Sequence, residues 1–189
     1  MFGSSSAQRL VDDRYTHERQ SFLGSHRALA ACARELGRLS DEVVHGVAAL
    51  PSAHVEHKAT VRQSPSRCIV QLGPVALTVA WLRSSNDSVA TGELLVIVWR
   101  GAVAPARKHQ PERPHVGPAP LAATALWEQV LTAVADSEAT WSWQPRNTEL
   151  VRCSSTELAA RCVGQLCAAY LDSDAESHLL SDPNPASVA

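Results

Sequence analysis

The chain contains 189 residues, of which 45% are hydrophobic and 19% are charged, and its formal net charge is −2. This size accommodates one domain with a buried core, and the nearly balanced charge argues against a general affinity for nucleic acid or for anionic membranes. The longest strongly apolar run, LLVIVW at 94–99, is too short to cross a bilayer, so no membrane association is expected.

The N-terminus and the cysteines predict a cytoplasmic protein. The first ten residues, MFGSSSAQRL, lack the apolar core of a secretory signal. Five cysteines are spread along the chain without a CxxC pair, which favours reduced thiols that act as small hydrophobic side chains. Residues 1–13 are expected to form a flexible N-terminus ahead of a single domain over 14–171.

A long helix is predicted from about Arg14 to Leu50, either continuous or broken near Ser40. Its apolar residues recur at every seventh position, and this heptad-like stripe includes Phe22, Leu29, Leu36 and Val43. One interpretation makes these four residues a partner-binding surface through which two copies pair. The other interpretation makes the stripe the buried side of an amphipathic helix that lies along a sheet.

Four strands are predicted after this helix, at about 55–63, 67–72, 75–83 and 93–100. Turn-like segments separate them, namely SPS at 64–66, GP at 73–74 and SSNDSVATG at 84–92.

The third and fourth strands do not alternate between apolar and polar residues. In VALTVAWL (75–82) one face is large and the other is small but uncharged, and in LLVIVW both faces are large and apolar. A sheet with one solvated face alternates instead. We therefore expect each face of the sheet to be covered by a helix, by a second subunit or by the wall of a ligand cavity.

The middle of the chain is rich in proline. The segment APARKHQPERPHVGPAP (104–120) contains five prolines and is predicted to be an exposed connector, because proline fits neither a helix interior nor a strand ladder.

Two further helices and a hairpin are predicted in the last third. Residues 121–138 fit a helix, 139–145 fit a strand, and 148–153 fit its hairpin partner. Ser154 and Glu157 have the spacing of a capping box that begins a helix over 154–171. The acidic segment 172–189 is expected to be a disordered tail.

These elements define the expected fold class. It is α+β, a single domain with an antiparallel meandering sheet of about five to six strands, a long N-terminal helix and two further helices, in the order α-β-β-β(-β)-α-β-β-α.

The stretch HVEH carries two histidines and a glutamate that could ligate a metal. In an extended chain, however, the rings of His54 and His57 point to opposite sides, and the helical zinc motif spaces its histidines differently. A third ligand would have to come from His45 or Cys68. We expect these residues to be the polar start of a strand and predict no metal and no cofactor.

No catalytic arrangement is recognisable in the sequence. GxSxG, GxxxxGK and GxGxxG are all absent, and Cys162 and Cys167 are spaced too unfavourably on a helix to act as a ligand pair. No catalytic residue is therefore predicted.

Two functional hypotheses remain. The leading one is a non-catalytic protein-binding or chaperone-like module that acts through apolar sheet and helix surfaces, with a homodimer as one form of it. The alternative is a small-molecule-binding domain or enzyme whose pocket is walled by tryptophans, namely Trp81, Trp99, Trp141 and Trp143.

Overall fold

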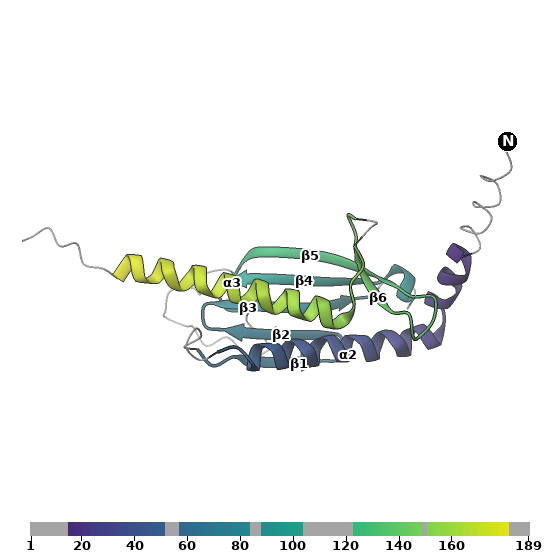
Figure 1. Ribbon diagram of the computed structural model, residues 1–189, viewed down its shortest axis with the longest axis horizontal. Coiled ribbons are helices and arrows are strands. Elements are labelled where there is room, and N and C mark those ends of the chain that lie inside the picture. Colours follow the sequence, from purple (N-terminus) through teal and green to yellow (C-terminus); the bar gives the residue numbers. More distant parts are fainter. Residues whose placement is uncertain (1–14, 52–56, 84–87, 104–122, 149–150, 182–189) are drawn as a thin grey trace, which may run out of the picture.

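A six-stranded antiparallel sheet forms the centre of the computed structural model, which describes residues 15–51, 57–83, 88–103, 123–148 and 151–181. The strands follow one another as a meander in which each pairs with its neighbour in sequence (Figure 1). They are β1 (Thr60–Ser64), β2 (Arg67–Leu72), β3 (Val75–Leu82), β4 (Glu93–Arg100), β5 (Thr124–Val134) and β6 (Ser142–Pro145). The predicted α+β class with one antiparallel sheet is confirmed.

The N-terminal part of the chain is helical but divided early. Residues 15–23 are helical, and α2 (His26–Ala48) follows after a turn at Gly24. Ser25 caps α2 by accepting a hydrogen bond from the backbone N–H of Ala28 on its side-chain oxygen, at 3.2 Å. The break therefore precedes Ser25, whereas α2 continues unbroken through the buried Ser40.

The last helix, α3 (Ser155–Ser181), begins at the predicted capping box. The side-chain oxygen of Ser154 accepts a hydrogen bond from the Glu157 N–H at 3.2 Å, and a Glu157 carboxylate oxygen accepts one from the Ser154 N–H at 2.8 Å. The hydrogen bonds that the Ser154 N–H and hydroxyl donate to this carboxylate hold the pKa of Glu157 below its ordinary value. The helix runs to Ser181, past residue 171 where the expected domain ends.

One predicted element has the wrong type. Residues 121–138 were expected to be a helix, but 124–134 form strand β5, which pairs with β4 along most of its length. Of the expected hairpin partner at 148–153, the described residues 148 and 151–153 contribute a bridge between Cys153 and Trp143. The predicted first strand also begins later, at Thr60. The N-terminus 1–13, the connector 104–120 and residues 182–189 lie outside the described ranges.

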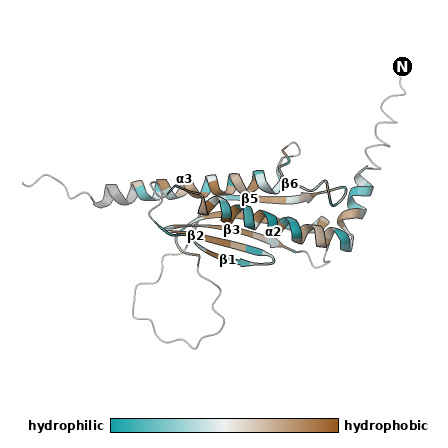
Figure 2. Cartoon of the chain, turned by 60° about the horizontal axis from the view of Figure 1, so that its bottom comes forward, coloured by the Kyte–Doolittle hydropathy of each residue, from teal (hydrophilic) through white to brown (hydrophobic). Residues whose placement is uncertain are grey.

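Both long helices pack on the same face of the sheet (Figure 1). Because side chains alternate along a strand, this face receives every second residue. In the three central strands these residues are almost completely buried, and they are Cys68, Val70, Leu72, Val75, Leu77, Val79, Trp81, Leu94, Val96 and Val98. Figure 2 shows apolar colour on β2 and β3 and a largely hydrophilic outer side on α2. The core therefore lies between the helices and one face of the sheet.

Candidate functional site

The heptad-like stripe of α2 lies inside the chain's own core. Leu36 and Val43 are 7% and 0% exposed, and Phe22 and Leu29 are partly buried against the same cluster. The structure therefore places Leu29, Leu36 and Val43 on the side of α2 that packs on the core, and Phe22 in the preceding helical segment. A second copy could contact Leu36 and Val43 only if α2 left the sheet.

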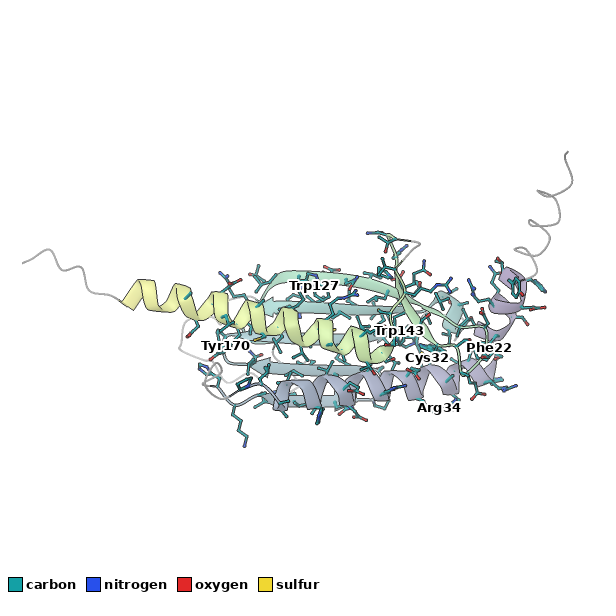
Figure 3. The ribbon with its side chains drawn as sticks, in the orientation of Figure 1. Phe22, Cys32, Arg34, Trp127, Trp143 and Tyr170 are labelled. Carbon is teal, nitrogen blue, oxygen red and sulfur yellow. The ribbon has the colours of Figure 1, made fainter. Side chains whose placement is uncertain are left out.

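Three of the four predicted pocket tryptophans pack against one another. The Trp143 ring contacts Trp81 and Trp141 edge to face, with ring centroids 5.9 and 5.7 Å apart. Trp143 lies toward the end of the molecule that also holds Phe22 and Cys32 (Figure 3). Trp81 and Trp143 belong to the core there, and Trp141 packs against it.

The fourth tryptophan lies on the other side of the sheet. Trp99 pairs with Ala76, whose side chain points away from the helices, and its Nε1 donates a hydrogen bond to the Thr78 hydroxyl at 3.1 Å. Of the four predicted pocket residues, the structure thus brings together Trp81, Trp141 and Trp143, whereas β3 and β4 separate Trp99 from them.

The HVEH stretch is described only at His57. Its Nδ1 lies 2.8 Å from the Tyr170 hydroxyl oxygen, and the two rings meet edge to face. His54 lies outside the described ranges. Among the described residues there is no group of three or more His, Cys, Asp or Glu side chains that could hold a metal ion.

The buried cysteines are poorly suited to nucleophilic chemistry. Burial raises the pKa of Cys32 and of Cys162 from an ordinary 9.0 to about 12, and it also raises the pKa of Cys68 and Cys153. A thiol with a raised pKa stays protonated at neutral pH, and the thiolate is the reactive form. These side chains therefore act as small core residues.

The side of the sheet that faces away from α2 and α3 is the main unassigned surface. We call it the open face, because in the part of the chain that the structure describes no helix or strand covers it. Strand alternation and register define its central members, which are Arg62, Arg67, Ile69, Gln71, Ala76, Thr78, Ala80, Leu95, Ile97, Trp99, Glu128 and Val130.

The centre of the open face is apolar. Ile69, Leu95, Trp99 and Val130 are half-buried in the single chain, and Ile97 is 7% exposed. The open-face side chains of β3, Ala76, Thr78 and Ala80, are small and buried between larger neighbours. A surface of this kind is typical of a protein interface or an apolar ligand site.

One row of residues, paired across neighbouring strands, crosses the open face from a positive to a negative side chain. The register aligns Arg62 with Ile69, Ile69 with Thr78, Thr78 with Ile97, and Ile97 with Glu128. A cation therefore stands at one margin, an anion at the other, and apolar and neutral side chains between them. Both charges are exposed, and neither forms an ion pair or hydrogen bond within the described residues.

Sequence reasoning found only part of this surface. The apolar second face of β4, with Leu95, Ile97 and Trp99, is visible in the pattern of LLVIVW. Glu128 and Val130 were missed because their segment was expected to be a helix. Arg62 was missed because its position in the row depends on register, which no local pattern specifies.

Comparisons with known proteins provide no family or relative. No family model matches the chain, and no curated protein and no solved structure matches it. In the described ranges, moreover, none of the helices combines the length and apolarity needed to cross a bilayer. The function must therefore be argued from the surface itself.

Proposed function

We propose that this protein is a non-catalytic protein-binding module that uses the open face of its sheet as the binding surface. The observation that supports this proposal is the group of half-buried apolar side chains on the open face, Ile69, Leu95, Trp99 and Val130, on a sheet whose other face is already packed. When another surface buries apolar area of this kind, the complex is stabilised by about 25 cal/mol of free energy per Å².

The alternative of a ligand-binding domain or enzyme receives less support. The tryptophans that would line its pocket are divided between the two faces, and burial keeps the thiols of Cys32 and Cys162 protonated. A hollow of about 700 Å³ exists where β5, β6 and α3 meet, but its lining includes no tryptophan.

Site-specific photocrosslinking in cells tests this proposal. Leu95, on the open face, is replaced with benzoylphenylalanine, and the matched control carries the same group at Gln165, on the exposed side of α3. We expect ultraviolet light to give a discrete protein adduct from position 95 and none from position 165. Mass spectrometry then identifies the adduct as a second copy or as another protein.

The proposal fails if position 95 gives no adduct in cells. It also fails if both positions give the same adducts, because the labelling would then reflect general proximity and not the open face.

A further inference from the structure

We propose that the open face binds the open face of a second copy of this chain, around a two-fold axis that runs along β3. This inference rests on the proposed function, because it names the partner of the same surface. The inference rests on one row of the open face, which consists of Arg62, Ile69, Thr78, Ile97 and Glu128. A two-fold rotation reverses the order of this row, so that its positive end meets the negative end of the second copy.

The complementarity follows from where each residue falls after the rotation. An axis along β3 places β1 of one copy over β5 of the other and β2 over β4. Arg62 then faces Glu128 of the second copy, and Ile69 faces Ile97. Because a two-fold contact is isologous, each pair forms twice. Along this row the dimer would thus bury apolar side chains at its centre and pair opposite charges at both margins.

The same charges exclude the other simple orientation. An axis in the plane of the sheet but across the strands, at the level of this row, places β1 over β1 and β5 over β5. Arg62 would then face Arg62, and Glu128 would face Glu128. Like charges held together across an interface are destabilising, so the charge row selects the axis along the strands.

The middle strand suits a position on this axis. Ala76, Thr78 and Ala80 are its open-face residues, and each would lie across from its own counterpart. Their small size permits the usual separation of about 10 Å between packed sheets without a collision. The Trp99 ring, whose Nε1 is hydrogen-bonded to Thr78, extends over β3 and would be enclosed between the two sheets.

The area of the face indicates a reversible dimer. Strands β1 to β5 are spaced by about 4.8 Å, and eight residues at about 3.3 Å each span β3, which gives a projected area of roughly 500 Å². Stable interfaces bury about 800 Å² of accessible surface on each partner. The contact is therefore smaller than that of a typical stable complex, as expected of a reversible dimer.

A charge-reversal cycle, measured by sedimentation equilibrium of the purified full chain, tests this geometry. We expect the wild type to be in reversible monomer–dimer exchange. Arg62→Glu and Glu128→Arg should each weaken the dimer by about tenfold or more, because each replaces two attractions with two repulsions. The double variant should restore the wild-type dissociation constant to within a few-fold. Circular dichroism checks that each variant is folded.

Two results would overturn the inference. One is a wild type that stays monomeric up to its solubility limit, and the other is a dimer that neither single reversal weakens. If either result occurs while the photocrosslink at position 95 identifies a different protein, the proposed function stands and only the self-pairing is wrong. If no adduct forms either, both proposals fail.

Discussion

The side chain of Ser155 joins three elements through two hydrogen bonds. Its hydroxyl oxygen accepts a bond from Trp143 Nε1 at 3.0 Å, and its hydroxyl donates one to the Glu35 carboxylate at 2.6 Å. The first residue of α3 is thereby connected to β6 and to α2. Ser155 is only 3% exposed, so water cannot easily replace either partner.

Removing this hydroxyl should be costly. Ser155→Ala leaves the Trp143 N–H without a partner in the core, and we expect the free energy of unfolding to fall by about 1–3 kcal/mol. Urea unfolding followed by circular dichroism measures the change. Thr156→Ala, one residue along on an exposed position, is the control and should change stability by less than about 0.5 kcal/mol. Equal effects in the two variants would contradict the bridging role of Ser155.

At the scale of elements, the most instructive disagreement is β5. Its segment contains Ala, Leu, Glu and Gln, which favour helices, and Leu126, Val130 and Val134 are spaced as on a helix face. In the structure the same residues form a strand because backbone pairing with β4 and packing of Leu131 in the core outweigh local propensity. Strands β2 and β4 were predictable because turn residues bound their apolar runs.

Alanine substitutions at two glycines, Gly92 and Gly37, test the packing of the Trp81 ring. A Cβ on Gly92 would collide with the ring of Trp81, whereas a Cβ on Gly37, within α2, would meet no atom within 4 Å. We expect Gly92→Ala to destabilise the fold by about 1–3 kcal/mol through overpacking, and Gly37→Ala to stabilise it by about 0.5–1 kcal/mol through helix propensity. Thermal unfolding compares the two, and shifts of the same sign would contradict the packing described for Trp81.

At the scale of the whole molecule, the sequence correctly indicated that the central strands are apolar on both faces. It could not assign the covering layers. Two helices cover one face, although the heptad-like stripe of α2 equally suggested pairing with a second copy, because a core helix and a coiled coil share this periodicity. The open face could be identified only after register aligned residues from five strands.

The two faces of the sheet thus have different roles, one in stability and the other in binding. The packed face and the tryptophan cluster around Trp143 stabilise the single chain, while Leu95, Trp99 and Val130 contribute little to that core. Because these side chains lie outside the core, the open face is available for binding a partner. The charges of Arg62 and Glu128 at the margins then select the partner's orientation.

The most direct test of this account is the rate at which hydroxyl radicals oxidise Trp99 in the purified chain, measured by mass spectrometry over a dilution series. Tyr15, which is 61% exposed and belongs to the N-terminal helical segment, serves as the internal reference. The account predicts that Trp99 is protected at high protein concentration and becomes reactive on dilution, while Tyr15 reacts equally throughout. An oxidation rate of Trp99 that does not change with concentration would contradict the burial of the open face against a second copy.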